Sequence, residues 1–120
     1  MKLRTKPSGK GRKRYIVFRI HSSSILPYYN IQNAVFDSMK NWLGMKELAE
    51  SHARVIKNLW NERQQAGIIV CSHRFVDGVK MALALITQIG DEKVVFRTFV
   101  VSGTIKAAKE KAKARHSISL

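Results

Sequence analysis

The side chains that could carry out chemistry in this sequence are few and far apart. A nuclease that cuts with its own residues needs clustered carboxylates for metal ions, or a general acid and base within reach of one phosphate. The acids and histidines, which show neither arrangement, are Asp37, Glu47, Glu50, Glu62, Asp77, Asp91, Glu92 and Glu110, and His21, His52, His73 and His116. Glu47 and Glu50 could share a helical face and Asp91 and Glu92 a turn, but such exposed pairs are common. We predict no catalytic residue and no metal ligand in this chain.

The single cysteine does not change this conclusion. Cys71 ends the apolar run 67–71, so the chain can form neither an intrachain disulfide nor a cysteine zinc cluster. We expect it to be a small buried side chain rather than a nucleophile. The sequence also has no glycine-rich phosphate loop followed by Lys-Ser or Lys-Thr, and no serine in a nucleophile elbow.

The charge is large and sits at the two ends of the chain. The sequence has 22 Lys and Arg against 8 Asp and Glu, for a net charge of +14. Residues 1–14 carry +7 and residues 104–120 carry +4. Such a distribution favours binding to a polyanion, because each phosphate neutralised releases a condensed counterion. The alternative is that the charged tails only keep the protein soluble, but acidic residues would provide solubility equally well.

Nine of the ten candidate RNA-binding residues lie in these basic ends, and the tenth, Arg74, lies at the end of the third predicted strand, where it could contact phosphate. They are Lys10, Arg12, Lys13, Arg14, Arg74, Lys106, Lys109, Lys111, Lys113 and Arg115. In a helix after residue 104, Lys106, Lys109 and Lys113 share one face, with Lys111 and Arg115 on an adjoining one. Lysines without interleaved aromatics bind backbone phosphates, so selectivity should come from nucleic-acid shape or from partners.

Length and hydropathy predict one compact domain with basic ends. With 120 residues, 45% of them hydrophobic, the chain can bury a core. We divide it into a flexible basic arm (1–13), a folded α/β domain (14–103) and a basic C-terminal helix and tail (104–120). No apolar run approaches the roughly 20 residues that span a bilayer, and residues near the N-terminus lack a secretory signal. We therefore expect a soluble, cytoplasmic protein without a membrane partner.

The order of predicted elements indicates an α+β fold. Runs of β-branched and aromatic residues predict strands at 14–20, 53–60, 67–73 and 93–101. Apolar residues at helical spacing predict helices from Pro27 to Gly44, with a further turn over 45–51, over 75–89, and from a cap at Ser102 or Thr104 to Lys113. The order β-α-β-β-α-β plus a C-terminal helix is the ferredoxin-like split βαβ arrangement of four-stranded RNA-binding domains, with a largely antiparallel sheet.

Two features of the strands bear on how the sheet is used. Residues 94–101 are apolar at both alternating positions, so both faces of the sheet should be covered. The third strand carries Ile68, Ile69 and Val70 where RNA-binding sheets have an aromatic signature, so bases are not expected to stack there. The last helix has only a thin apolar stripe, Ile105, Ala108 and Ala112, which is expected to hold it weakly.

Several segments together resemble a known family. They are Arg14-Tyr15-Ile16-Val17-Phe18, Leu43-Gly44, Gly67-Ile68-Ile69-Val70-Cys71, residues 79–86, and Ser102-Gly103-Thr104-Ile105-Lys106-Ala107-Ala108-Lys109. In order and spacing these resemble protein component 2 of archaeal ribonuclease P, whose eukaryotic counterpart is shared by the nuclear ribonucleases P and MRP. The likeness spans about residues 13–110.

The resemblance implies a subunit of a ribonuclease P endonuclease rather than an enzyme by itself. In this family the RNA subunit uses Mg²⁺ to remove 5′ leaders from precursor tRNA, so this chain should bind no cofactor of its own. The implied partners are the RNase P RNA, precursor tRNA indirectly, and a TIM-barrel-like protein subunit in a heterodimer or heterotetramer. From the residues alone, a ribosomal or general RNA-binding protein and a stand-alone metal-dependent nuclease stay open as alternatives.

Overall fold

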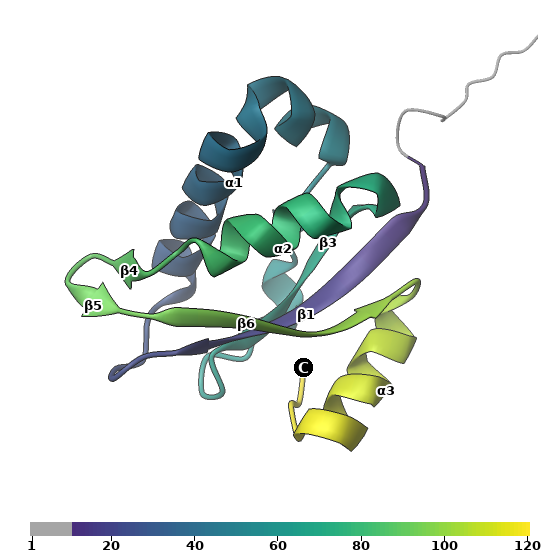
Figure 1. The fold of residues 1–120 in the computed structure, drawn as a ribbon. Coiled ribbons are helices and arrows are strands. Elements are labelled where there is room, and N and C mark those ends of the chain that lie inside the picture. The colour runs from purple at the N-terminus through teal and green to yellow at the C-terminus, as the bar shows by residue number, and fades with distance from the viewer. Residues whose placement is uncertain (1–10) are drawn as a thin grey trace, which may run out of the picture.

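A four-stranded antiparallel sheet organises the molecule. The structure is a computed structural model that describes residues 11–120. Strands β1 (Lys13–His21), β2 (Arg54–Val55), β3 (Ala66–Ser72) and β6 (Val95–Ser102) lie in the order β2-β3-β1-β6. Helices α1 (Tyr28–Ser51) and α2 (Val76–Ala84) cover one face, and α3 (Ile105–His116) covers the other (Figure 1). This arrangement confirms the predicted α+β, ferredoxin-like fold.

Strand β1 forms the centre of the sheet because its residues are apolar on both sides. Ile16, Val17 and Phe18 are all fully buried. Ile16 and Phe18 belong to the cluster under α1 and α2, whereas Val17 belongs to the cluster under α3. The prediction that both faces are covered is therefore confirmed, and the chain itself supplies the cover on each side.

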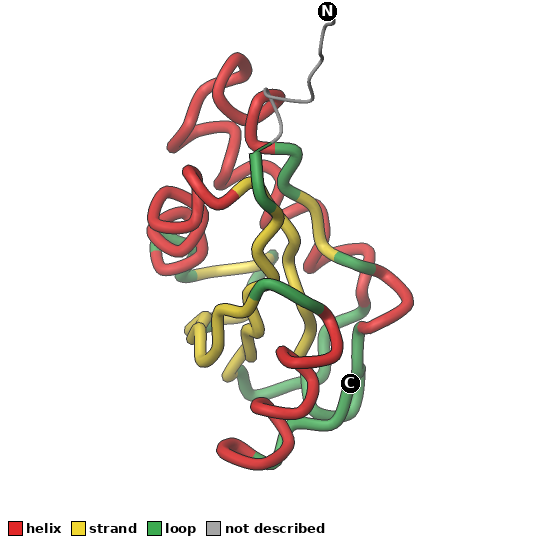
Figure 2. The backbone as a smooth tube through the Cα atoms, turned by 90° about the vertical axis from the view of Figure 1, so that its right-hand side faces the viewer, coloured by secondary structure: helices red, strands yellow, loops and turns green. Residues whose placement is uncertain are grey.

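The second face is closed by α3 together with the residues that follow it. Ala108 and Ala112 of the predicted stripe are fully buried, but Ile105 is 37% exposed. Ile118 beyond the helix takes its place in the core, with no exposed surface. The segment 117–119 is fixed to the turn before β3 (Figure 2) by hydrogen bonds from Asn61 to the Ser119 carbonyl (2.7 Å) and from Gln64 to the Ser117 carbonyl (2.9 Å). The helix is thus held by more than the thin stripe that we expected.

Gly44 divides α1 into two segments, as its predicted role as a helix end implies. Its backbone adopts φ 83° and ψ 160° in the middle of the helix, a conformation that residues with a Cβ rarely adopt. The chain then resumes a helix up to Ser51, which accounts for the predicted turn over 45–51. No helix within residues 11–120 has the length and apolar character needed to cross a membrane.

The prediction of a strand over 53–60 is largely wrong. Only Arg54 and Val55 pair with β3, and the 3-10 turn η2 (Lys57–Leu59) follows. The apolar residues of this segment suggested a strand, but their side chains pack on both faces of the sheet. Val55 and Trp60 pack under the helices, whereas Ile56 and Leu59 pack in the cluster under α3. The backbone has to leave the sheet edge to place them there.

The second helix is shorter than predicted, although the burial of its apolar positions was predicted correctly. The short 3-10 turn η3 (His73–Phe75) leads into α2, which ends at Ala84. Ile86 and Ile89 are buried, but they lie on the loop and on the small hairpin of β4 (Gln88–Ile89) and β5 (Glu92–Lys93). Gly90 turns this hairpin at φ 60°. Ile86 and Ile89 therefore fit the helical period of the sequence, but they reach the core from the loop after α2 and from β4.

Gly67 is required where a tryptophan ring lies over the sheet. It pairs with Phe18 across β1 and β3, and a Cβ at this position would lie 2.9 Å from Trp60 Cε3 and 3.3 Å from the Phe18 ring. We expect Gly67→Ala to lower the free energy of unfolding by about 1–3 kcal/mol through overpacking, as measured by urea denaturation. Gly103→Ala is the control, because its Cβ would meet only Arg14 Nη1, at 3.6 Å. Equal losses in the two variants would show that the Trp60 contact is not the cause.

Candidate nucleic-acid interface

Helix α3 presents cations on both sides of its buried stripe. Thr104 caps the helix, its Oγ1 accepting a hydrogen bond from the Ala107 amide at 3.1 Å, so the second of the two predicted caps is the one used. Successive residues are turned by about 100° around a helix axis. Measured from buried Ala108 and Ala112, this places Lys106, Lys109 and Lys113 on one side of the stripe. Lys111 and Arg115 lie on the other side rather than on an adjoining face. Lys109 is half-buried and the other four side chains are exposed.

The first basic residues lie beside the start of α3. The register of β1 and β6 pairs Tyr15 with Ser102, so residues 12–14 continue past the point where the chain enters α3. Arg14 Nη1 lies 3.6 Å from the position that a Cβ on Gly103 would take. Basic segments from opposite ends of the sequence thus meet at one end of the sheet. Lys10 lies outside the described residues, so its place in this surface stays a prediction.

Hydrogen bonds fix the described part of the arm to the end of β3. The His73 amide donates to the Arg12 carbonyl at 2.6 Å, and the Arg12 amide donates to His73 Nδ1 at 3.1 Å. Gly11, at φ 63°, allows the close approach, because a Cβ there would lie 3.0 Å from the His73 ring. Arg12, Lys13 and Arg14 are therefore presented from a defined backbone, with Arg12 and Lys13 exposed.

Arg74 is placed differently from the other predicted residues. Its guanidinium lies over the Phe75 ring, 5.4 Å from the centroid. It also lines a cavity of about 560 Å³ together with Glu47 and Glu50. Carboxylates that line the same cavity offer this arginine an alternative to a phosphate. Among the predicted cations that the structure describes, Arg74 is the one whose surroundings favour RNA contact least.

Sequence reasoning missed three cationic or polar side chains that the fold brings to this surface. Arg97 lies 5.5 Å from the centroid of Phe99, whose ring packs at 4.6 Å against His116 at the end of α3. His52 and Arg54 line a cavity with Lys13. His52 and Arg54 meet Lys13 through the pairing of β1, β3 and β2, which brings together residues about 40 positions apart, whereas Arg97 is placed by the pairing of β6 with β1. Alternation along each strand would have found them only once that register was known.

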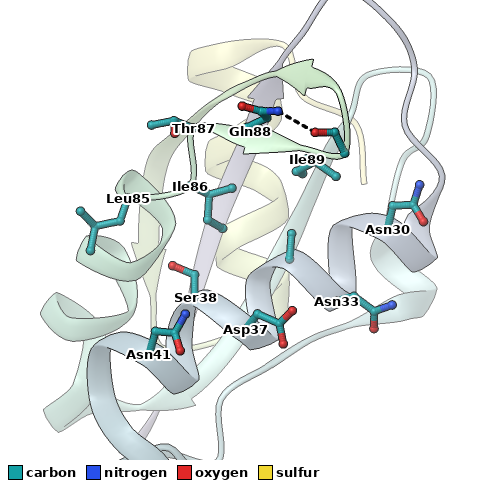
Figure 3. Close-up of a pocket in the computed structure, with 12 residues that line it drawn as sticks. Asn30, Asn33, Asp37, Ser38, Asn41, Leu85, Ile86, Thr87, Gln88 and Ile89 are labelled. Atoms are coloured by element: carbon teal, nitrogen blue, oxygen red, sulfur yellow. Dashed lines mark hydrogen bonds between the residues drawn. The ribbon is translucent and has the colours of Figure 1, made fainter.

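A polar cavity beside α1 lacks the pair of titratable groups that catalysis would need. Figure 3 shows this cavity of about 630 Å³ between α1 and the segment 85–90, which includes β4, and it is lined by Asn30, Asn33, Asp37 and Asn41 along the helix. Asp37 is the only ionisable side chain among its lining residues. Acid–base catalysis on one phosphate needs a second such group. Throughout residues 11–120, no three His, Cys, Asp or Glu side chains come together in a group that could hold a metal ion.

Cys71 and Glu92, whose pKa values depart from the ordinary ones, have structural roles. Burial raises the pKa of the Cys71 thiol to about 11, so very little thiolate exists at neutral pH. Glu92 accepts a hydrogen bond from Ser23 at 2.7 Å, and hydrogen bonds from Ser23 and then Ser24 lower the pKa of this carboxyl group. Glu92 thereby ties the β5 hairpin to the loop after β1. Neither group has the surroundings of a nucleophile or a general acid.

Known proteins share both the sequence and the fold. Residues 14–113 match the Rpp14/Pop5 family. The chain belongs to this family. Ribonuclease P protein component 2 of Thermococcus kodakarensis is 33% identical over 110 residues, covering 92% of this chain and 90% of that protein. The protein of the same name from Archaeoglobus fulgidus is 34% identical over 105 residues, covering 88% and 92%.

A solved structure supports the fold independently. One chain in the cryo-EM structure of yeast ribonuclease MRP aligns with 89% of this chain and 96% of its own length, with a TM-score of 0.58. At 10% identity, this likeness establishes the architecture alone. The Rpp14/Pop5 chain described here therefore has the family's sequence pattern and shares its fold with a chain of the yeast ribonuclease MRP structure.

Proposed function

We propose that this chain is an RNA-binding protein subunit of ribonuclease P, which supports RNA-catalysed removal of the 5′ leader from precursor tRNA. The observation that carries this proposal is the match to ribonuclease P protein component 2 of several archaea over about nine-tenths of both chains. The surface chemistry is consistent with it. The chain carries a net charge of +14, and the two cationic ends meet at one end of the sheet.

The burial of the central strand favours RNA contact at the exposed cations of the arm and α3 rather than on the sheet. A four-stranded RNA-binding domain stacks bases on aromatics in its central strands. Here Ile16, Val17 and Phe18 of central β1 are fully buried between α1, α2 and α3. The exposed cations of the arm and α3 therefore bind backbone phosphates, which position the RNA without reading its sequence.

The specific partners are part of this proposal, and the resemblance to ribonuclease P protein component 2 supports them. The chain contacts the RNase P RNA directly and precursor tRNA indirectly. A TIM-barrel-like protein subunit joins it in a heterodimer or heterotetramer within a cytoplasmic complex. The Mg²⁺ ions used in hydrolysis are bound by the RNA subunit, and this chain supplies no cofactor.

A reconstitution assay tests the proposal. The full chain is incubated with precursor tRNA and Mg²⁺, with and without the RNase P RNA and the other protein subunits. We expect cleavage at the mature 5′ end only when the RNA is present, and faster cleavage when the chain is added. Specific cleavage by the chain without RNA would establish a stand-alone nuclease. Co-purification with ribosomes without the RNase P RNA would establish a ribosomal protein instead.

The electrostatic mechanism predicts a strong salt dependence of RNA binding. If the cations of the arm and α3 neutralise about five phosphates, the logarithm of the affinity should fall with the logarithm of salt concentration with a slope of roughly −3.5 to −4.5. Filter binding between 0.05 and 0.3 M salt, roughly the range over which counterion release is measured, would determine the slope. An affinity independent of salt would contradict phosphate contact by these residues.

A further inference from the structure

A small cavity lies on the second face of the sheet, away from the part that α3 covers. It has a volume of about 240 Å³ and is lined by Lys13, His52, Arg54, Val70 and Ser72. The sheet register explains how these residues meet. Lys13 pairs with Ser72, and Arg54 pairs with Val70. By alternation they share the face of Val17 and Ile68. Helix α3 packs on β1 and β6, whereas this cavity extends toward β2 at the other edge.

Ser72 supplies the strongest indication that the cavity binds a ligand. The residue is 3% exposed, and its hydroxyl has no hydrogen-bond partner within the part of the chain that the structure describes. Buried hydroxyl groups in folded proteins are nearly always paired, because leaving one unpaired forfeits the hydrogen bond that it made with water. A hydroxyl left unpaired among cationic side chains is satisfied when an oxyanion enters and accepts its hydrogen bond.

The other lining groups select for a small anion. Arg54 offers a planar guanidinium that can bind two oxygens of one phosphate, Lys13 a compact positive charge, and His52 a ring N–H donor. No carboxylate lines the cavity. Its volume is below the roughly 300–1,000 Å³ typical of pockets that enclose a whole organic ligand. The chemistry and size together fit a single tetrahedral phosphate group.

We propose that Lys13, His52, Arg54 and Ser72 form a pocket for one backbone phosphate of the bound RNA. This inference rests on the function proposed above, and it places RNA on the sheet edge at β2 as well as on the arm and α3. The RNA backbone is favoured over free phosphate because the cavity adjoins the cationic residues of the arm. Lys13 lines the cavity and is flanked by Arg12 and Arg14 of the arm.

Two serine variants test the pocket without altering the net charge. Ser72 and Ser102 are both buried, at 3% and 4% exposed, and both carry an unpaired hydroxyl, but only Ser72 lines the cavity. We expect Ser72→Ala in the full chain to weaken binding to the RNase P RNA about tenfold, as losing a hydrogen bond to a charged group implies. Ser102→Ala should bind as the wild type does. Thermal unfolding should show both variants to be at least as stable as the wild type.

Two arginine variants test the charge of the pocket. Arg54→Gln should weaken RNA binding about tenfold and make the salt slope shallower by about 0.7–0.9, because one phosphate contact is lost. Arg63→Gln removes the same charge from an exposed position beyond the opposite end of β3, and it should change the affinity less than twofold. These two variants keep the test decisive if Ser72→Ala fails to fold.

The outcomes separate the pocket from the proposed function. If the wild-type chain does not bind the RNase P RNA, the proposed function is wrong. If the wild type binds with a steep salt slope but Ser72→Ala and Arg54→Gln match their controls, only the pocket is wrong. Titration with inorganic phosphate, followed by the backbone amide NMR signals of Gly11 and Ser72, distinguishes the two sources of phosphate. Phosphate bound there that the RNA does not displace would overturn the assignment to an RNA backbone.

Discussion

Replacing Phe18 with alanine should lower the free energy of unfolding by about 3–5 kcal/mol. The side chain is fully buried in the central strand, and its ring stacks on Trp60 at 6.0 Å and on Phe96 at 5.9 Å between centroids. Truncation leaves a cavity that rings from two other elements cannot easily fill. Since domains are typically stable by 5–15 kcal/mol, the loss is a large fraction of the total.

Urea denaturation followed by far-UV circular dichroism would measure this effect. Phe36→Ala is the matched control, because it makes the same chemical change on α1 at a side chain that is 45% exposed. We expect the control to cost less than about 1 kcal/mol, in line with surface substitutions. Similar losses in both variants would mean that the ring stack over β1 is not the centre of the core.

The aromatic stack also shows which parts of the fold can be predicted from the sequence. The central strand is recognisable because five of the six residues from Tyr15 to Ile20, all but Arg19, are β-branched or aromatic and lie between a basic segment and a serine loop. Trp60 was assigned to a strand, yet it reaches the same core from beyond a 3-10 turn. Hydrophobicity predicted that each residue is buried. The backbone path that buries it depends on partners elsewhere in the chain.

The packing of α3 and Ile118 on the second face of the sheet likewise depends on distant parts of the chain. Apolar residues at both alternating positions of β6 correctly predicted that each face of the sheet is packed. The residue that completes this packing, Ile118, lies outside the helical pattern, after a residue with φ 58°. Its burial depends on hydrogen bonds between the segment 117–119 and the turn at Asn61 and Gln64, and no local pattern indicates those bonds.

The candidate site also has one part that the sequence predicts and one part that it does not. The cations of α3 could be predicted because helical spacing is local, but their separation to either side of a buried stripe required knowing that Ala108 and Ala112 pack on the sheet. The cavity at Lys13, His52, Arg54 and Ser72 could not be predicted. It joins residues from three strands and from the C-terminal end of α1, and the pairing that unites them is set by the whole fold.

The largest functional effect is expected from neutralising one side of α3. At 0.1 M salt, counterion release contributes about 0.7–0.9 logarithmic units of affinity for each phosphate contact. The triple variant Lys106→Gln, Lys109→Gln, Lys113→Gln should therefore bind the RNase P RNA roughly a hundredfold to several hundredfold more weakly. Its salt slope should become shallower by about 2–3. Glutamine has a helix propensity close to that of lysine, so α3 should stay folded.

A second triple variant supplies the matched control. Arg63→Gln, Lys80→Gln and Lys93→Gln together remove the same three charges from exposed positions outside the predicted interface. If the affinity depends on net charge alone, the two triple variants will weaken binding equally, and the assignment of RNA contact to α3 is wrong. If α3 holds the RNA backbone, the control should keep most of the wild-type affinity and salt slope. Circular dichroism of both variants serves as the folding control. An unfolded α3 would lower the helical signal, so an unchanged signal attributes the weaker binding to lost phosphate contacts.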